Sequence, residues 1–276
     1  MSNLTHLTPA QRTARDIWTS GNYPEVAERL IRGFGPALVD ELRIGPGQRL
    51  LDLACGAGNV AIPAAIAGAD VTGLDIAPAL LARGAAEAWA AGVDVTWVEG
   101  DAEALPFDDA SFDVVTSAVG VMFCPAHERA AAELVRVCRP GGSIGLIAWT
   151  PEGLIGSLFG VLAPYAPPPP AGARAGSLWG TEQYVSELLG DGVDELCSER
   201  RSILFDGVAP DAFVNLMRAS YGPVLRVFER LQDDRARADE LDAALRRFAR
   251  ACNQGGPGAP RLESEYQLTL ARRRAD

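Results

Sequence analysis

The stretch LLDLACGAGNV, residues 50–60, decides the fold of this chain. Its apolar beginning indicates a buried strand, and Gly56 and Gly58 indicate a tight turn that leads into a helix. Glycine has no Cβ, so the backbone at both positions can approach a ligand closely. The helix that follows offers unpaired N–H groups and a partial positive charge. Units of this kind bind nucleotide-like ligands in several enzyme classes, so the turn alone leaves the ligand open.

Short apolar strands alternate with helices on both sides of this turn. Strands are predicted at residues 49–54, 69–77, 93–102, 111–119 and 143–150, and helices at 60–68, 78–92 and 126–142. Strands and helices in such alternation form βαβ units, in which the strands run parallel and helices cover both faces of the sheet. The expected fold class is therefore α/β.

The ends of the chain add further helices and strands. Two helices are predicted within residues 9–32, with a break at residues 20–22, and a helix with Thr181 as its N-cap is predicted to end at Gly190. Strands are predicted at 193–205 and 264–273, and two helices within 210–250. Residues 151–180 are rich in Pro and Gly, which is typical of an extended loop or a lid.

No composition shift demands a second domain, so we expect one domain over residues 1–276. We divide it into a helical cap (1–40), a cofactor-binding half (41–150) and a sheet-closing half (151–276). The last part carries a substrate-side insert at about 151–190.

Charge and composition exclude several classes of partner. The net charge of −11 and the pI of about 4.8 disfavour nucleic acid and anionic membranes, because such a surface repels phosphate. Five cysteines without a CxxC pair suit reduced thiols and a cytoplasmic protein, and the two histidines lack metal-ligand spacing, so no metal is expected. We find no signal-peptide core or membrane-spanning run.

Three acidic residues at the ends of consecutive predicted strands narrow the choice of ligand. Asp52 precedes the glycine turn, where its carboxylate can orient a cationic amino group and would repel a pyrophosphate. Asp75 ends the second strand and can accept both hydroxyls of a ribose; its alternative role is a helix N-cap. Asp101 and the N–H of Ala102 match the N6 amine and N1 of an adenine, although a solvated loop carboxylate is the alternative.

S-adenosylmethionine combines the three expected features, which are a cationic amino-acid end, a ribose and an adenine. A rival is an NAD-dependent oxidoreductase, because Gly56–Ala61 also fits a loose dinucleotide fingerprint. The absence of a phosphate-binding group in the motif and the presence of Asp52 count against this rival.

Four stretches in order resemble the class I S-adenosylmethionine-dependent methyltransferases, in particular the small-molecule, ubiquinone-type branch of methyltransferase type 11. These stretches are LLDLACGAGNV (50–60), VTGLDIAP (71–78), EGDAEALPFDDASFDVV (99–115) and ELVRVCRPGGSIGLIAW (133–149). The strong match covers about residues 45–150, and the final EYQLTLARR resembles the last strand of that fold. The resemblance implies a Rossmann-like, seven-stranded, mostly parallel sheet with one antiparallel strand near its edge.

The resemblance also implies roles for individual residues. Asp52, Gly56 and Gly58 would surround the methionine end of the cofactor, near the carbonyl of Ala54, and Ser117 would lie beneath it. Asp75 would hold the ribose, with Ile76 beside it in the cofactor-binding set, and Asp101 and Ala102 would read the adenine. Ala54 stands where glycine is more usual in the family.

Two aromatic residues and one histidine complete the expected site. Trp18 and Tyr23 lie in a segment that resembles a cofactor-covering helix pair, although ordinary packing explains them equally well. His127 follows the fourth strand and is the candidate catalytic base; the alternative is a structural role at a helix N-terminus.

The expected activity is methyl transfer from S-adenosylmethionine to a small, largely apolar molecule, such as a natural product of secondary metabolism or a quinone-like aromatic. An in-line displacement would leave S-adenosylhomocysteine. The alternative is a protein of this fold that binds the cofactor without methyl transfer, as a cyclase or a regulator. A monomer or a homodimer fits the sequence equally well.

Overall fold

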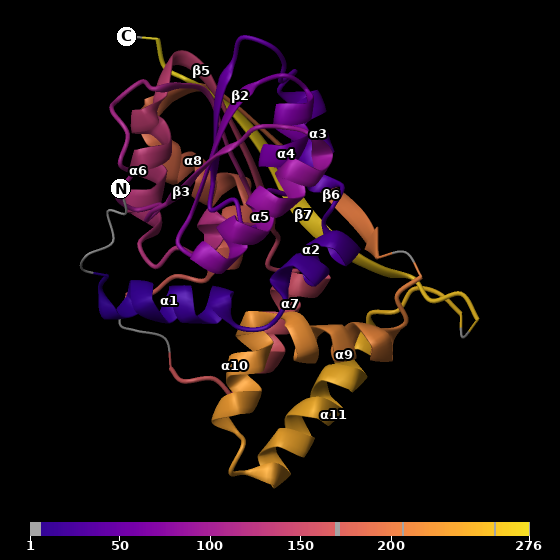
Figure 1. Ribbon diagram of the computed structural model, residues 1–276. Coiled ribbons are helices and arrows are strands. Elements are labelled where there is room, and N and C mark those ends of the chain that lie inside the picture. Colours follow the sequence, from indigo (N-terminus) through magenta and orange to yellow (C-terminus); the bar gives the residue numbers. More distant parts are fainter. Residues whose placement is uncertain (1–6, 169–171, 206, 257, 276) are drawn as a thin grey trace.

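A seven-stranded sheet forms the centre of the computed structural model, which describes residues 7–168, 172–205, 207–256 and 258–275 (Figure 1). The strand order is β3-β2-β1-β4-β5-β7-β6. The strands are β1 (Arg49–Leu53), β2 (Asp70–Asp75), β3 (Thr96–Glu99), β4 (Phe112–Ala118), β5 (Cys138–Trp149), β6 (Val193–Phe205) and β7 (Leu262–Arg273). The first five are parallel, and β7 is antiparallel to both of its neighbours, which confirms the predicted fold class.

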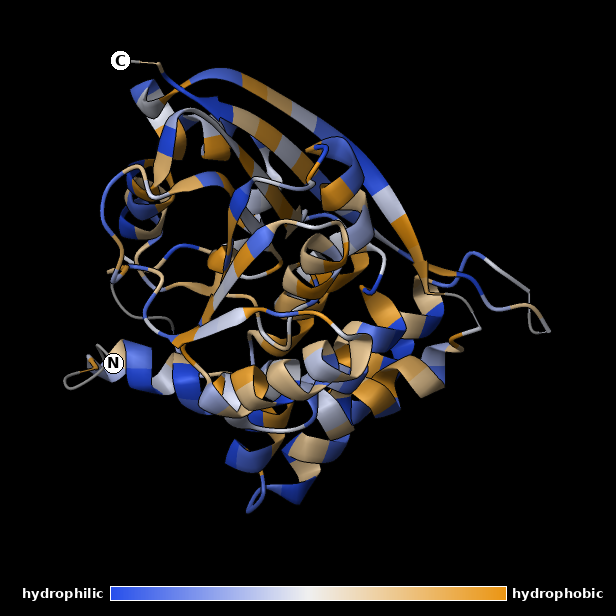
Figure 2. Ribbon diagram, turned by 45° about the horizontal axis from the view of Figure 1, so that its top comes forward, coloured by the Kyte–Doolittle hydropathy of each residue, from blue (hydrophilic) through white to orange (hydrophobic). Residues whose placement is uncertain are grey.

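Helices cover both faces of this sheet because the inner strands are apolar on both sides. Figure 1 shows α6 (His127–Val137) and α8 (Glu182–Leu189) on one side and α3 (Phe34–Glu41), α4 (Ala61–Ile66) and α5 (Pro78–Ala91) on the other. In β1, Leu50 belongs to the smaller apolar cluster beside α4, whereas Leu51 and Leu53 belong to the main core. A parallel strand buried on both faces shows this near-continuous apolar pattern. Along the long outer strands β6 and β7, by contrast, hydrophobic and hydrophilic residues alternate (Figure 2).

A second group of helices lies at the end of the sheet where the parallel strands terminate (Figure 1). It contains α1 (Pro9–Thr19), α2 (Tyr23–Leu30), α7 (Leu154–Leu162), α9 (Pro210–Ser220), α10 (Gly222–Arg230) and α11 (Arg235–Ala251). Short 3₁₀ turns lie at η1 (Val121–Phe123), η2 (Gly176–Gly180) and η3 (Gly190–Gly192). In the described residues, no helix has the length and apolar character needed to cross a membrane.

Two segments in the second half of the chain differ from their predicted secondary structure. The segment predicted as a loop or lid contains α7, because its apolar run buries Leu154, Ile155, Leu158 and Leu162 against the core. Three helices replace the two expected within 210–250, because the chain turns at Tyr221–Gly222 and a new helix begins with Pro223 in its first turn. Part of the proline run at 167–170 lies outside the described residues.

Candidate active site

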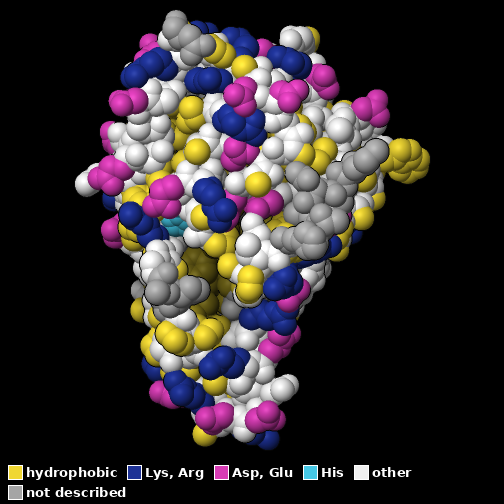
Figure 3. Space-filling view, turned by 90° about the vertical axis from the view of Figure 1, so that its left-hand side faces the viewer, with side chains coloured by type: hydrophobic (Ala, Val, Ile, Leu, Met, Phe, Trp, Pro, Cys, Tyr) yellow, Lys and Arg dark blue, Asp and Glu magenta, His cyan; other side chains and the backbone are white. Residues whose placement is uncertain are grey.

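A cavity of about 580 Å³ lies where the parallel strands end, between the glycine turn and helices α1 and α2. Its walls come from the turn after β1, the ends of β2 and β4, the start of α5, the segment 100–102 and the region around η1. Ligand sites of open α/β sheets occur at this edge, and the volume lies within the usual range for small-molecule sites. The space-filling view shows one face of the molecule hollowed, with hydrophobic side chains on the floor (Figure 3).

The backbone of the glycine turn has φ values that residues other than glycine rarely adopt. Gly56 and Gly58 have φ values of +57° and +89°, and Ala54 has +53°. A Cβ at Gly58 would lie 2.7 Å from the ring of Trp97, so this position has no room for a side chain. Ala54, Gly56 and Gly58 all line the cavity, as the sequence predicted for a ligand-binding turn.

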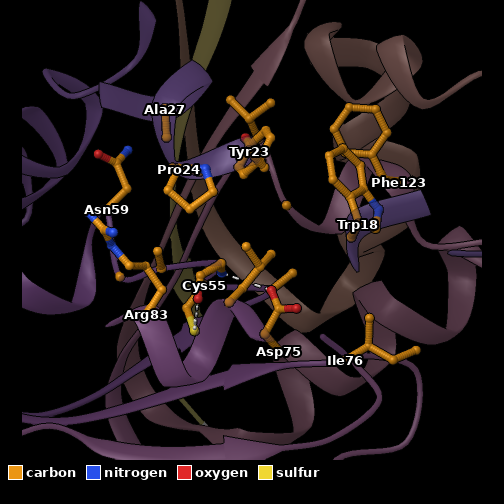
Figure 4. A pocket seen from close by; sticks show the side chains of 18 of the residues that line it. Trp18, Tyr23, Pro24, Ala27, Cys55, Asn59, Asp75, Ile76, Arg83 and Phe123 are labelled. Atoms are coloured by element: carbon orange, nitrogen blue, oxygen red, sulfur yellow. Dashed lines mark hydrogen bonds between the residues drawn. The ribbon is translucent and has the colours of Figure 1, made fainter. Parts of the chain in front are cut away.

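Asp75 connects the end of β2 to this turn and lines the cavity. One of its carboxylate oxygens accepts a hydrogen bond from the Gly56 N–H at 2.8 Å (Figure 4). The other accepts from the Ala77 N–H at 2.8 Å. Asp75 is 6% exposed, and burial raises the pKa of its carboxyl group. The residue therefore shapes the turn and also presents a carboxylate to a ligand; Ile76 beside it lines the same cavity.

Asp101 and Ala102 both line the cavity, and a side chain of α1 contacts Asp101. One Asp101 oxygen accepts from the Glu103 N–H at 2.9 Å, and the other accepts a hydrogen bond from the side-chain amide of Gln11. An ion pair of 2.9 Å between Arg15 and Glu99 ties the same helix to the end of β3. Gln11 was not among the predicted site residues, although it forms a capping box with Thr8 that marks the start of α1.

Aromatic side chains close the side of the cavity away from the sheet. Figure 4 shows the rings of Trp18 and Phe123 beside each other, with Tyr23 nearby. The ring centroids of Trp18 lie 4.8 Å from those of Phe123 and 5.2 Å from those of Tyr23. A Cβ at Gly56 would be 3.8 Å from Tyr23 Cε1, so the phenol edge covers the glycine turn. Trp18 of α1 and Tyr23 of α2 thus both line the cavity.

Asp52 and Ser117 do not line the cavity, although Asp52 was predicted to surround the methionine end of the cofactor and Ser117 to lie beneath it. The Asp52 carboxylate accepts from the Ala61 N–H at 3.0 Å and from the Thr116 hydroxyl at 3.2 Å, and the residue is 1% exposed. The Ser117 hydroxyl donates to the Leu53 carbonyl at 2.7 Å and accepts from the Val121 N–H at 3.0 Å. Both residues stabilise the loops beneath the cavity, because these hydrogen bonds join the strand ends to the segments that follow them.

The buried carboxyl group of Asp52 predicts a pH effect on stability. Burial, opposed by its hydrogen bonds, raises its pKa to about 7. The folded protein therefore keeps a proton that the unfolded chain releases near pH 4, so this group stabilises the fold at low pH and that stability is lost as the pH rises through about 7. We expect Asp52→Asn to gain about 2 to 3 kcal/mol relative to the wild type between pH 5 and pH 8. Urea unfolding at several pH values measures this difference, and a pH-independent difference would contradict it.

His127 lies outside the cavity, which corrects its predicted role as the base. The residue is 3% exposed, and its Nδ1 is 2.7 Å from the hydroxyl of Tyr184. Its ring also contacts Trp179 edge-to-face, with centroids 5.7 Å apart. Desolvation by burial lowers its pKa, so the neutral ring serves the packing of α6 against α8 and η2. The placement supports the alternative structural role.

Comparison with known proteins agrees with this fold. The model of the methyltransferase domain family matches residues 51–146, which include the glycine turn, Asp75 and Asp101. The chain belongs to the S-adenosylmethionine-dependent methyltransferase domain family. Two uncharacterised proteins of Mycobacterium tuberculosis are 44% and 42% identical to it; the matches cover 95% and 98% of this chain and 94% and 100% of the relatives.

More distant relatives have named activities. A demethylmenaquinone methyltransferase of Thermus thermophilus is 38% identical over 51% of this chain and 65% of its own length. Among solved structures, the YcgJ protein from Bacillus subtilis covers 87% of this chain and 98% of its own, with 18% identity and a TM-score of 0.59. The [4+2]-cyclase SpnF has 18% identity and a TM-score of 0.58, covering 94% of this chain and 85% of its own. These structures share the fold.

Proposed function

We propose that this protein transfers the methyl group of S-adenosylmethionine to a small, largely apolar molecule. A lone pair of the acceptor atom forms the new bond to the methyl carbon while the C–S bond breaks. The electron pair of the broken C–S bond remains on sulfur, and S-adenosylhomocysteine forms. The protein has to align the acceptor with the C–S bond and exclude water, because the sulfonium methyl is already activated. The observation that carries this proposal is one cavity that joins the glycine turn, the carboxylates of Asp75 and Asp101 and an aromatic wall.

The lining of the cavity fits S-adenosylmethionine better than a dinucleotide. Its arginines in the described part of the chain, Arg29 and Arg83, are each paired with a glutamate four residues away on the same helix. A pyrophosphate would thus meet no free cation, while it would approach the carboxylate of Asp75. A cationic ligand gains from the same charges.

The residues present suggest how the cofactor would be held. Asp75 would accept the ribose hydroxyls, and Asp101 and Ala102 would meet the adenine, with Gln11 giving up its hydrogen bond to the Asp101 carboxylate. The turn at Ala54–Gly58 would receive the methionine part. We assign Asp52 an indirect role, in which its carboxylate supports the turn from below and favours positive charge above it when ionised.

The acceptor side supports a small, apolar substrate. Trp18, Tyr23 and Phe123 form its wall, and Ala118 and Val119 form the floor next to the turn. The net charge of −11 argues for a small molecule in place of a nucleic acid. In the described residues, the cavity wall offers no histidine as a base, so we expect an acceptor whose nucleophilic atom needs little activation.

Titration calorimetry and a transfer assay test the proposal together. We expect binding of S-adenosylmethionine and S-adenosylhomocysteine in the micromolar range and none of NAD. Incubation with cofactor labelled at the methyl group and a metabolite mixture should then give a labelled small molecule. Binding of NAD alone would overturn the assignment. Tight binding of S-adenosylmethionine without any transfer would favour the alternative of a cofactor-binding cyclase or regulator. The solved structure of the [4+2]-cyclase SpnF shows that a cyclase can have this fold.

A further inference from the structure

Glu103 is a buried carboxylate between two segments that line the cavity. The residue is 6% exposed, and it directly follows Asp101 and Ala102 in the turn after β3. One of its carboxylate oxygens accepts a hydrogen bond from the Ala126 N–H at 2.7 Å, and the other forms an ion pair of 3.1 Å with Arg129. The side chain of Glu103 therefore joins the turn after β3 to the beginning of α6.

At α6, Glu103 supplies a cap that the helix itself lacks. Ala126 is the N-cap residue of α6, and its side chain has no oxygen that could accept from the first N–H groups. In a capping box, a glutamate of the same helix accepts a hydrogen bond from the N-cap N–H. Here a glutamate from a distant segment accepts that hydrogen bond, and its negative charge lies at the positive end of the helix. Glu103 thus fixes the place where α6 begins.

The part of the cavity wall that precedes α6 is anchored at both ends. This wall consists of residues 123–125, which all line the cavity. Before it, the Val121 N–H donates to the Ser117 hydroxyl at 3.0 Å. After it, the Ala126 N–H donates to Glu103. Loss of the second anchor would leave this wall attached at one end.

The backbone of Glu103 belongs to the tight turn that carries the proposed adenine contacts. The Ala104 N–H donates to the Asp101 carbonyl at 3.1 Å, and the Glu103 N–H donates to the Asp101 carboxylate at 2.9 Å. The second hydrogen bond orients this carboxylate. Because α6 holds the side chain of Glu103, one residue fixes the Asp101 carboxylate and the Ala102 N–H relative to residues 123–125.

The negative charge of Glu103 is unfavourable at this buried position. Burial raises the pKa of its carboxyl group, the Ala126 N–H opposes this effect, the charge of Asp101 adds to it, and Arg129 opposes it. The net result is a raised pKa, which means that the surroundings disfavour the charged form. The useful property of the side chain is therefore its length, which carries an acceptor oxygen to Ala126.

We propose that Glu103 is a positioning residue for cofactor recognition, which holds Asp101 and Ala102 at the separation from residues 123–125 that an adenine ring requires. This inference rests on the proposed function, because that function places the adenine at Asp101 and Ala102. Glu103 acts through Asp101 and has no need to touch the cofactor. Its loss should impair the discrimination between purines, whereas the loss of a residue that only stabilises the fold should leave this discrimination unchanged.

Two cofactor products that differ only in the purine test this role on the full-length protein. S-adenosylhomocysteine has an N6 amine and an unprotonated N1, which match the Asp101 carboxylate and the Ala102 N–H. S-inosylhomocysteine has a carbonyl oxygen and an N1–H in their places. We expect the wild type to bind S-adenosylhomocysteine at least about tenfold more tightly, the effect of a charged hydrogen bond. Titration calorimetry measures both affinities.

Substitutions of Glu103 separate its length from its charge. Glu103→Gln keeps the length and an acceptor oxygen, so we expect a preference within about twofold of the wild type. Glu103→Asp keeps the charge but is one methylene shorter, and Glu103→Ala removes the acceptor; both should reduce the preference below about threefold. Glu128→Ala, which removes an exposed carboxylate at the same end of α6, is the control and should keep the preference. Urea unfolding shows whether each variant folds, and Glu103→Asp gives the reading if Glu103→Ala does not fold.

Several outcomes would overturn the positioning role. They are an unchanged preference in folded Glu103→Asp or Glu103→Ala, an equal loss in Glu103→Gln and Glu103→Asp, an equal loss in Glu128→Ala, and equal binding of the two products to the wild type. The affinity of the wild type for S-adenosylhomocysteine, measured first, separates this inference from the proposed function. A wild type that binds neither product contradicts the proposed function itself.

Discussion

Replacement of Asp75 with alanine is expected to weaken the binding of S-adenosylmethionine by about 100-fold. The carboxylate would hold the ribose, and its loss removes charged hydrogen bonds that are each worth about 1.5 to 3 kcal/mol. The effect should lie near the upper end of this range, because the same carboxylate accepts the Gly56 N–H and so holds the glycine turn in shape. Titration calorimetry with S-adenosylmethionine measures the affinity.

Asp70→Ala is the matched control, since this exposed carboxylate begins the strand that Asp75 ends. We expect its cofactor affinity to stay within about twofold of the wild type, as is usual for surface changes. Circular dichroism and urea unfolding show whether each variant folds. A folded Asp75→Ala protein with unchanged affinity would remove the ribose assignment.

Gly35→Ala is expected to destabilise the protein by about 3 kcal/mol, the upper end of the usual cost of overpacking, and to weaken cofactor binding as well. Gly35 is buried in α3, and a Cβ there would collide with the carbonyl oxygen of Asn59, which follows the glycine turn. The side chain of Asn59 also donates to the Ile31 carbonyl at 3.1 Å. The added methyl group must therefore displace either the helix or the turn, because a backbone carbonyl has no alternative rotamer.

Gly33→Ala provides the control two residues earlier in the same segment. Gly33 is exposed with a φ of −76°, and a Cβ there meets no atom within 4 Å. We expect a change in stability below about 0.5 kcal/mol. Urea unfolding and calorimetry of both variants test the comparison. Equal stability of the two variants would show that α3 does not constrain the turn.

The local sequence was sufficient to place the residues at the sheet side of the cavity. Gly56, Gly58 and Asp75 lie at the ends of neighbouring parallel strands, and the carboxyl ends of such strands meet at one edge of the sheet. The same reasoning placed Asp101 and Ala102 at the cavity. In each case, a strand of a few residues and the turn after it fix the position of the residue, so distant parts of the chain are not needed for the prediction.

The same local reasoning failed where burial decides what a side chain can do. Asp52 stands directly before the turn, yet its carboxylate points to Ala61 and Thr116 and not into the cavity. His127 has the chemistry of a base, but α8 and η2 cover it and Tyr184 takes its Nδ1. A strand pattern shows that a residue lies near an edge, but it does not show which helix will later cover that residue.

The sequence by itself therefore determined the α/β class, the parallel core of the sheet and the glycine turn with its carboxylates, because contiguous segments encode these features. Only the tertiary structure decided which helices close over the cavity and which side chains they bring together. Gln11 reaches Asp101 across 90 positions of the chain, and Tyr221 reaches Tyr23 through the packing of two turns. Contacts between such distant segments depend on how whole helices pack, and neither hydrophobic periodicity nor residue spacing contains that information.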